Sequence, residues 1–472
     1  MPGFQIENFG CRAARADGEA IAANLRALEQ RQPFAADVVV VNTCSVTAEA
    51  DRAARAFIRR AHRRNPAARI VVTGCYAQRA PQEVAGMAGV AAVVGNSHEA
   101  LAPEIISALA HGAIPAAVRA PALIPVASLL SARAPQSAAV QAAPVWADDR
   151  FAHSFIEDAH LAVMQVAPGA QTRPNLKIQE GCGNRCTFCV IPQTRGPSKS
   201  LPHAVVMRQV EAFVAAGGKE LVLSGINLGR YSSGPETLAR LARTIIEETP
   251  LPRLRLSSIE PMDWDNDLIG LMREFGGARL ARHAHLPLQS GSDAVLRRMH
   301  RRYRPWHYME KAAALLRAAG PELTLGADVM VGFPGETERE FDETVAFIRA
   351  LPFGYLHLFP FSPRPGTLAW VLHAASLVPQ AVVEERMAAL RALAAEKTQT
   401  HRQRFIGRDL AAITLHTAGP LAARGRTSAL TENFLPVEID ARLPANHLVQ
   451  VEVTGLTSDA ALLAREFARK SI

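Results

Sequence analysis

Residues 181–189 read Gly-Cys-Gly-Asn-Arg-Cys-Thr-Phe-Cys and place Cys182, Cys186 and Cys189 in one short stretch. Cysteines this close together can hold a single small inorganic centre, and iron–sulfur clusters are held by cysteine thiolates, normally four of them. Because no fourth cysteine lies nearby, one iron of a four-iron cluster would stay open to an outside ligand. A cofactor or substrate bound to that iron could receive an electron directly.

Two alternatives remain open for this cysteine stretch. A structural zinc site needs four ligands in a closed tetrahedron, and the nearest histidines, His160 and His203, do not have the spacing of a zinc finger. Three unrelated structural thiols are the other alternative. We expect the cluster, because grouped cysteines in an intracellular enzyme usually serve metal or redox chemistry.

The cysteine stretch follows the first of six predicted strands, which alternate with helical patterns such as Ala204–Ala216, Thr237–Glu248 and Glu338–Ala350. Six βα units in sequence predict a full or partial parallel barrel, whose chemistry lies at the C-terminal ends of the strands. The strands are expected at Leu176–Gln179, Glu220–Ser224, Arg253–Ser257, His285–Leu288, Thr324–Val331 and Tyr355–Phe359.

Residues 1–100 form another region of short β-branched runs and helical patterns, which predicts a parallel sheet built from βα units. Three further cysteines, Cys11, Cys44 and Cys75, each follow a predicted strand of this sheet. Ligands collect at the carboxyl ends of such strands, where side chains from different units converge. The spacing of these three cysteines by itself is weak evidence for a metal site. When they are judged alone, a structural role as buried core residues is the better explanation. The strands are expected at Phe4–Phe9, Val38–Val41, Ile70–Val72 and Ala91–Val94.

The chain has 472 residues, of which 49% are hydrophobic and 20% charged, as expected of a folded protein with two or three domains. It has no apolar stretch long enough to span a bilayer and no segment typical of a secretory signal, so we expect a cytoplasmic protein without a membrane partner. The formal charge of +8 favours a polyanionic partner such as nucleic acid. This signal is modest, because arginine greatly outnumbers lysine and codon bias explains that excess equally well.

Changes in composition divide the chain into four parts. Residues 115–144 are rich in alanine and proline, which is typical of a linker or a loosely ordered insertion. Short β runs at Leu410–Leu415, Pro436–Ile439 and Leu448–Val453 predict a small antiparallel barrel or sandwich. We therefore expect an N-terminal α/β domain, a linker, a partial barrel and a small C-terminal β-barrel at residues 1–114, 115–165, 166–400 and 401–472, respectively.

Several short motifs, together with the cysteine stretch, resemble the radical S-adenosylmethionine (SAM) enzymes and, among these, the methylthiotransferases. The resemblance extends over nearly the whole chain outside residues 115–144, and the motifs together are highly specific. One departure is Ala14, three residues after Cys11, where the family usually has asparagine; the acidic residue three positions further on is Asp17. The motifs are Phe9–Cys11, Asn42–Thr47, Gly74–Gln78, Ile178–Cys182, Ser257–Pro261, Leu286–Ser292 and Val331–Thr337.

The resemblance implies two 4Fe-4S clusters and SAM as cofactors. SAM would bind the open iron of the second cluster and be cleaved to a 5′-deoxyadenosyl radical, while the first cluster would present the sulfur to be transferred. The resemblance also implies a TRAM-like C-terminal domain that contacts RNA, and a reductant such as flavodoxin or ferredoxin; no DNA partner is expected, and the sulfur donor stays open. The ligands would be Cys11, Cys44 and Cys75 for the first cluster and Cys182, Cys186 and Cys189 for the second.

Within the methylthiotransferases, the motifs are most similar to the enzymes that modify threonylcarbamoyladenosine at position 37 of tRNA. This similarity rests on residues 42–52, 75–78 and 178–181 and on Thr431–Phe434. Isopentenyladenosine in tRNA and an aspartate of a ribosomal protein are the alternative substrates of this branch. Two further alternatives are a radical SAM enzyme with a cobalamin-binding N-terminal domain, which would not need its first three cysteines, and a non-catalytic two-cluster protein that binds RNA or transfers electrons.

Some residues at predicted strand ends, and one inside the cysteine stretch, are candidates for binding SAM within this resemblance. They would face its adenine, its ribose or its amino acid part. For each of them, a role in a turn or in a layer of the barrel explains the position equally well. The candidates are Phe188, Gly225, Asn227, Glu260 and Gln289.

Two further patterns have a conventional explanation. Arginines recur at three- and four-residue spacing along the predicted helix Thr47–Arg64, as on a solvated charged face. The alternative is an RNA-facing patch that includes Arg55 and Arg59. His283 and His285 suggest a metal pair at first sight, but we interpret them as ordinary residues of the fourth barrel strand.

Overall fold

The computed structural model of the chain separates into two compact units. The first contains Met1–His160 together with Glu180–Gly183 and Val190–Pro197, and the second contains the remaining residues. Among the described residues, no helix is long and apolar enough to cross a membrane. The residues that the structure describes are 3–113, 142–157 and 172–467.

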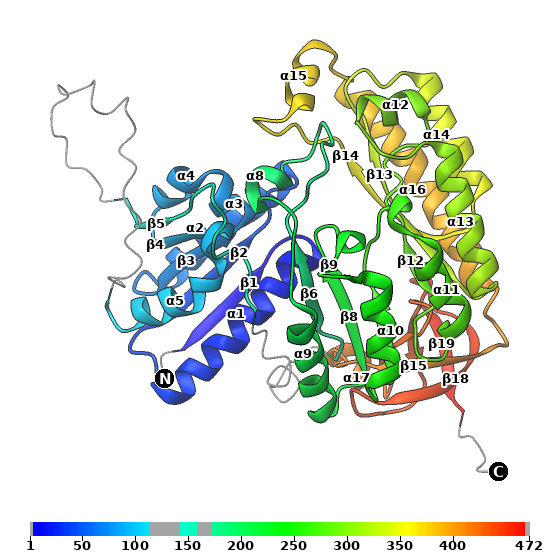
Figure 1. Cartoon of the computed structure of the whole chain (residues 1–472), viewed down its shortest axis with the longest axis horizontal. Coiled ribbons are helices and arrows are strands. Elements are labelled where there is room, and N and C mark those ends of the chain that lie inside the picture. Colours follow the sequence, from blue (N-terminus) through cyan, green and yellow to red (C-terminus); the bar gives the residue numbers. More distant parts are fainter. Residues whose placement is uncertain (1–2, 114–141, 158–171, 468–472) are drawn as a thin grey trace. The chain divides into compact units, whose positions relative to one another are not determined.

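The first unit is a parallel sheet with helices on both faces (Figure 1). Its elements are β1 (Phe4–Asn8), α1 (Arg12–Arg31), β2 (Val38–Thr43), α2 (Ala48–Arg64), β3 (Arg69–Gly74), α3 (Cys75–Arg79), α4 (Pro81–Ala85), β4 (Val90–Gly95), α5 (Ala102–Ala110), β5 (Val145–Trp146) and α8 (Ile191–Arg195). The strands lie in the order β1-β2-β3-β4-β5, and their valines and isoleucines favour extended backbone. One face packs against α1 and α5 and the other against α2, α3 and α4, so the expected parallel α/β sheet is confirmed.

The expected linker overlaps this sheet. Residues 142–157 lie within the range 115–165 that we expected to be a linker, yet they contain β5, whose Val145 and Trp146 pair with β4. Trp146 is buried in the apolar cluster formed by α1 and α5. A strand this short has no recognisable pattern in the sequence. The rest of the range lies outside the described residues.

The second unit contains a partial parallel barrel, as expected. Its strands are β6 (Asn175–Glu180), β7 (Lys199–Ser200), β8 (Glu220–Gly225), β11 (Arg253–Leu256), β12 (His283–His285), β13 (Thr324–Val331) and β14 (Phe353–Pro360). β6, β8 and β11 pair in parallel in one sheet and β12, β13 and β14 in another. Isolated bridges from Leu254 to Leu280 and from Ser258 to His285 join the two sheets.

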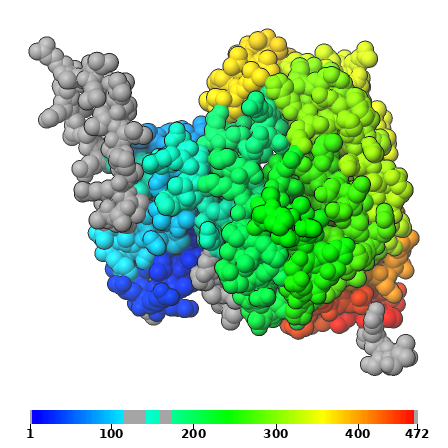
Figure 2. Space-filling view, in the orientation of Figure 1, coloured from blue at the N-terminus to red at the C-terminus, as the bar shows by residue number. Residues whose placement is uncertain are grey.

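Helices flank the strands of this barrel (Figure 1), and on the face drawn in Figure 2 the second unit has a closely packed surface. Thr237 and Thr337 accept hydrogen bonds from the first turns of α10 (Leu238–Glu248) and α14 (Glu338–Ala350), as threonines do at the start of a helix. The helices are α9 (His203–Ala215), α10 (Leu238–Glu248), α11 (Asn266–Phe275), α12 (Asp293–Arg298), α13 (Pro305–Ala319), α14 (Glu338–Ala350), α15 (Leu368–Ala375) and α16 (Gln380–Gln403).

The fourth barrel strand differs from the expected one at residues 285–288. The regular strand β12 begins at His283 and ends at His285. Beyond it, Leu286 and Leu288 still donate backbone hydrogen bonds to β13, but the regular pairing has ended. Because alternate residues of a strand share a face, the shift places both histidines on one face of the sheet.

A buried ion network lies at the N-terminal end of the partial barrel. Glu220, the first residue of β8, is fully buried. Its carboxylate lies 2.8 Å from Arg255 Nε, 3.2 Å from Arg253 Nη1 and 3.4 Å from Arg173 Nη1. Burial alone would raise the pKa of Glu220, but these guanidinium groups outweigh it and lower the pKa to about 2. Arg255 Nη2 also donates to the Thr431 carbonyl oxygen, at 3.2 Å.

Residues after α16 form a small closed β-barrel. Its elements are β15 (Asp409–Thr414), α17 (Gly419–Ala423), β16 (Thr427–Thr431), β17 (Pro436–Ile439), β18 (Leu448–Leu456) and β19 (Leu462–Glu466). The strands follow the order β15-β16-β17-β19-β18, and all neighbours are antiparallel except β17 and β19. Of the expected barrel or sandwich, the structure therefore shows the barrel, with β16 and β19 added to the three predicted runs.

The loop Thr431–Phe434 joins the small barrel to the N-terminal end of the partial barrel. Glu432 forms an ion pair with Arg282, with 2.7 Å between Oε1 and Nη2. The Phe434 ring packs on His283, with 4.2 Å between the ring centroids. This segment, which we singled out as a motif, therefore has a structural role inside the second unit.

We expect Glu220→Gln to destabilise the second unit by about 3–5 kcal/mol, because it leaves buried guanidinium groups without a counter-charge. The folded-state pKa lies below the ordinary value of 4.5, so the carboxylate stabilises the fold above that value, and this contribution is lost as the pH falls through 4.5 towards 2. Urea unfolding at a series of pH values measures both effects, and the variant should lose this part of the pH dependence.

The exposed ion pair of Glu274 with Arg243 provides the matched control. Its oxygen and nitrogen lie 2.7 Å apart, but both side chains are about half exposed, so solvent screens the pair. Glu274→Gln should therefore change the unfolding free energy little. Equal destabilisation by the two substitutions would contradict the importance of the buried network.

Candidate metal centres

Cys11, Cys44 and Cys75 lie at the carboxyl ends of β1, β2 and β3, which are neighbours in the first sheet. Gly10 has a backbone φ of 102°, and a Cβ there would lie 2.2 Å from Cys44 Cβ, so a glycine is required for this close approach. Burial, followed by the neighbouring thiols of Cys11 and Cys75, raises the pKa of Cys44 to about 12. Three cysteines far apart in sequence are thus close enough in space to influence one another.

This arrangement fits a metal cluster. Without a cation, neighbouring thiols resist ionisation because each thiolate repels the next, and for Cys44 this effect adds to the larger effect of burial in raising the pKa. Bound iron supplies the positive charge that makes several thiolates favourable at one place. Cys44 and Cys75 are buried whereas Cys11 is exposed, so the group can be reached from solvent on the Cys11 side.

A buried arginine contacts this cysteine group. Arg195, at the end of α8, donates from Nε to Cys75 Sγ at 3.3 Å. Its terminal nitrogens donate to both oxygens of Glu180, at 3.0 Å, and to Asp17 Oδ2, at 2.8 Å. Asn96 Nδ2 also donates to Cys75 Sγ, at 3.4 Å. Such donors orient a sulfur ligand.

Sequence reasoning did not find Arg195. It lies 120 residues from Cys75 and 178 residues from Asp17, so no local pattern connects them. Asp17 itself was noted as an acidic position, and the structure shows its partner. Ala14, the departure from the family pattern, is buried, and its carbonyl oxygen accepts a hydrogen bond from Asn42 Nδ2 at 2.5 Å.

Cys182 lies in the first unit, and Cys186 and Cys189 lie in the second. Cys189 N–H donates to the Cys186 carbonyl oxygen at 3.2 Å, which makes a tight turn. Arg301 Nη1 donates to Cys186 Sγ at 3.2 Å, and its Nη2 forms an ion pair of 2.5 Å with Glu260. Glu260, a predicted SAM residue, is therefore linked to Cys186 through Arg301, which sequence reasoning also missed.

Several other predicted SAM residues lie at strand ends of the partial barrel. Gln179 Oε1 accepts the backbone N–H of Asn227 at 2.6 Å, and a Cβ on Gly225 would lie 2.9 Å from Gln179 Cβ. Gln289 has a backbone φ of 63°, and its buried Oε1 has no hydrogen-bond partner among the described residues. A buried acceptor of this kind is costly unless a ligand donates to it. Phe188 is half-buried within the cysteine stretch.

The two arginines predicted to contact RNA differ in their surroundings. Arg55 Nη1 donates to the Tyr76 hydroxyl at 2.9 Å and to Glu83 Oε1 at 3.4 Å, so this side chain is held within the first unit. Arg59 is exposed, and its Nε donates to the Arg55 carbonyl oxygen. The other exposed arginines of α2 are Arg52, Arg60, Arg63 and Arg64.

Known proteins are similar to this chain along most of its length. The Radical SAM superfamily matches residues 176–348, and the uncharacterized protein family UPF0004 matches residues 3–95. The threonylcarbamoyladenosine tRNA methylthiotransferase MtaB of Treponema pallidum (strain Nichols) is 34% identical over 94% of this chain and 95% of its own. A tRNA-2-methylthio-N(6)-dimethylallyladenosine synthase of Syntrophotalea carbinolica is 30% identical over 87% of each chain. The solved structure of the radical S-adenosylmethionine methyltransferase TsrM from Kitasatospora setae, with cobalamin and a 4Fe-4S cluster bound, aligns with a TM-score of 0.48 and 15% identity over 73% of this chain and 67% of its own.

We expect Arg301→Lys to lower the midpoint potential of a cluster held by Cys186, because a hydrogen bond to a sulfur ligand stabilises the reduced form. The shift should be on the order of 60 mV, which corresponds to a tenfold change in a one-electron equilibrium. A redox titration followed by electron paramagnetic resonance (EPR) measures it, using the signal that added SAM perturbs. Arg302→Lys, beside it and more exposed, should leave the potential unchanged; equal shifts in both variants would exclude a specific contact.

Proposed function

Because this chain belongs to the radical SAM tRNA methylthiotransferases, we propose that it transfers a methylthio group to C2 of N6-threonylcarbamoyladenosine at position 37 of tRNA. Membership of the family implies a 4Fe-4S cluster and SAM. The similarity to MtaB of Treponema pallidum, which extends over nearly the whole of both chains, carries the proposal. The proposal includes the assignment of the two clusters, of their ligands and of the nucleoside.

We assign one cluster to each group of three cysteines. The position of the first three cysteines at neighbouring strand ends supports the first assignment, and the spacing of the second three supports the other. Within the first group, Arg195 and Asn96 hold the Cys75 sulfur in place. The ligands are Cys11, Cys44 and Cys75 for the first cluster and Cys182, Cys186 and Cys189 for the second.

The target position explains why such cofactors are needed. C2 of an adenosine carries an aromatic hydrogen without acidic character, so a general base cannot activate it at neutral pH. When bound, the clusters and SAM would supply one-electron chemistry and a transferable sulfur atom. The protein's residues bind and orient these groups: Arg301 and Glu260 position Cys186, and Gln179 fixes the Asn227 backbone at the strand ends.

A basic substrate-facing surface is consistent with tRNA as the partner. The exposed arginines of α2, among them Arg59, lie in the same unit as the first cysteine group. Arginines on one helix face can contact successive phosphates of an RNA backbone. We assign Arg59 to this surface, whereas Arg55 supports it from within through Tyr76. A small electron-transfer protein such as flavodoxin or ferredoxin would supply the electrons.

Dimethylallyladenosine-containing tRNA is the second candidate substrate. The similarity to the synthase of Syntrophotalea carbinolica supports it, at a slightly lower identity and over less of the chain. Both substrates are adenosines that differ in the group attached to N6. The chemistry at C2 and the two cysteine groups would be the same in either case.

We expect Cys11, Cys44 and Cys75 to bind their own cluster, so a variant with all three changed to alanine should lose half of its iron. Anaerobically reconstituted protein should contain about eight iron atoms per chain, and the variant about four. Iron and sulfide analysis with Mössbauer spectroscopy measures this. The variant should still form 5′-deoxyadenosine from SAM but should transfer no methylthio group.

The complementary variant, with Cys182, Cys186 and Cys189 changed to alanine, is the control. It should keep about four iron atoms but form no 5′-deoxyadenosine, because the SAM-binding cluster is missing. About four iron atoms in both the wild type and the first variant would mean that the N-terminal cysteines are structural. The proposed sulfur transfer from a first cluster would then be wrong.

We expect tRNA that carries threonylcarbamoyladenosine at position 37 to be converted, because threonylcarbamoyladenosine is named in the relative from Treponema pallidum, which is 34% identical over 94% of this chain. Matched tRNA with isopentenyladenosine (dimethylallyladenosine) at the same position should react at least about tenfold more slowly. This nucleoside lacks the polar groups of threonylcarbamoyladenosine, and a site built to hydrogen-bond a polar substrate rejects an analogue without those groups. Nuclease digestion and mass spectrometry of the nucleosides measure both products. The opposite order of rates would establish the second candidate substrate.

A further inference from the structure

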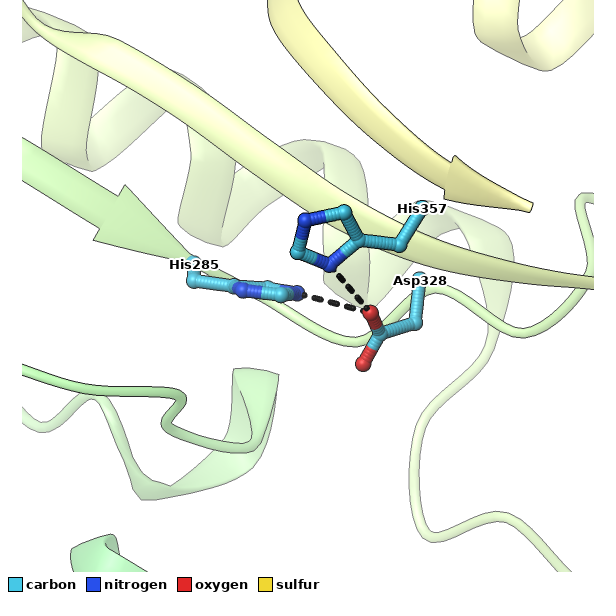
Figure 3. A group of neighbouring side chains, drawn as sticks. All are labelled: His285, Asp328 and His357. Atoms are coloured by element: carbon cyan, nitrogen blue, oxygen red, sulfur yellow. Dashed lines mark hydrogen bonds and ion pairs between the residues drawn. The ribbon is translucent and has the colours of Figure 1, made fainter. Parts of the chain in front are cut away.

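One group of metal-ligating side chains in the described part of the second unit lies outside both cysteine groups (Figure 3). His285 ends β12, Asp328 lies on β13 and His357 on β14, three strands that pair side by side in parallel. His285 Nε2 lies 3.2 Å from Asp328 Oδ1, and His357 Nδ1 lies 3.1 Å from the same oxygen. All three ligand atoms lie within 4.8 Å of one another.

These distances suit a common metal ion. Ligand atoms about 2.1 Å from one transition metal lie about 3.0–3.4 Å apart at octahedral or tetrahedral angles. The separations of 3.1 and 3.2 Å to the carboxylate oxygen lie in that range. Two imidazole nitrogens and one carboxylate oxygen form a donor set typical of zinc and non-haem iron sites. The other acidic group of this kind, Asp17, Glu99 and Glu180, instead surrounds Arg195.

His285 provides an independent observation. Its side chain is only 6% exposed, and its Nε2 has no hydrogen-bond partner among the described residues, although the Asp328 carboxylate is 3.2 Å away. The imidazole nitrogen therefore approaches the carboxylate without the alignment that an N–H donor requires. An unsatisfied buried nitrogen costs free energy, and a cation between it and the carboxylate would use its lone pair.

The exposure of the group also suits a cation. The His357 side chain is 55% exposed, which leaves one side of the group open to solvent. The Tyr355 ring packs against both imidazoles and forms the wall on another side.

We propose that His285 Nε2, Asp328 Oδ1 and His357 Nδ1 bind one divalent first-row transition-metal ion in addition to the iron–sulfur clusters. The solvent-facing side leaves coordination positions for an oxygen ligand, as in sites with three protein ligands. The proposal does not depend on the nucleoside that the enzyme modifies. It changes the interpretation of His285 from an ordinary strand residue to a ligand.

Titration of the anaerobic, cluster-loaded protein with Mn²⁺ tests this proposal. Loaded clusters occupy the cysteines, and Mn²⁺ prefers oxygen and nitrogen ligands to thiolates, so it reports on this group. The EPR signal of free Mn²⁺ should show one bound ion per chain, and Zn²⁺ should displace it because Zn²⁺ binds such ligands more tightly. Asp328→Asn and His357→Gln should each weaken Mn²⁺ binding by roughly tenfold or more.

His447→Gln, an exposed histidine of the small C-terminal barrel, is the matched control and should bind Mn²⁺ like the wild type. His357 is also exposed, so its substitution should not disturb folding, and circular dichroism with iron analysis checks that each variant is folded and loaded. The proposal would be overturned if the wild type bound no Mn²⁺ that Zn²⁺ can displace. It would also be overturned if the wild type, Asp328→Asn and His357→Gln bound Mn²⁺ with equal affinity. The contacts among the three side chains would then have a structural role only.

Discussion

Both units of this protein depend on parallel pairing between neighbouring strands. In a parallel sheet the carboxyl ends of all strands lie at one edge, so residues that follow different strands meet there. This places Cys11, Cys44 and Cys75 together although helices separate them in sequence. In the partial barrel, the same constraint places Gly225 and Asn227 beside Gln179. The cysteines of the first unit and these residues of the partial barrel thus lie at strand ends, while apolar side chains of the strands stabilise each unit.

Buried arginines complete the cysteine groups. A guanidinium group without water is very unfavourable unless carboxylates surround it, and Arg195 is held by Asp17 and Glu180. The same arginine donates to the Cys75 sulfur, so the carboxylates fix the direction of that hydrogen bond. Arg301 has the equivalent relation to Cys186 through Glu260. In each unit, an acid–arginine pair therefore supports a potential metal ligand, as outer-shell partners do in metalloproteins.

The opposite end of the partial barrel serves stability. Glu220 and its arginines fill the N-terminal end of the strands, and Thr431–Phe434 of the small barrel packs beside them. Because packing and ion pairs occupy this end, the carboxyl ends of the strands remain available for ligands, as in other barrels of parallel strands. The segment 431–434 therefore lies where the two barrels of the second unit join.

The sequence by itself determined the parallel α/β sheet, the partial barrel, the small C-terminal barrel and the family. These features follow from local patterns: β-branched runs, helical patterns such as Glu338–Ala350, and the spacing of Cys182, Cys186 and Cys189. It also indicated which strand ends carry candidate ligands. The short strand β5 and the start of β12 were not predicted, because two or three residues contain too little pattern.

Only the tertiary structure decided which distant side chains meet. Arg195 and Cys75 lie 120 residues apart, and Arg301 and Cys186 lie 115 residues apart. His285, Asp328 and His357 come from three different strands, and their meeting depends on the register between those strands. Register is set by packing and hydrogen bonding across the sheet, which involve residues distant in the chain, so no local pattern in the sequence could specify these contacts.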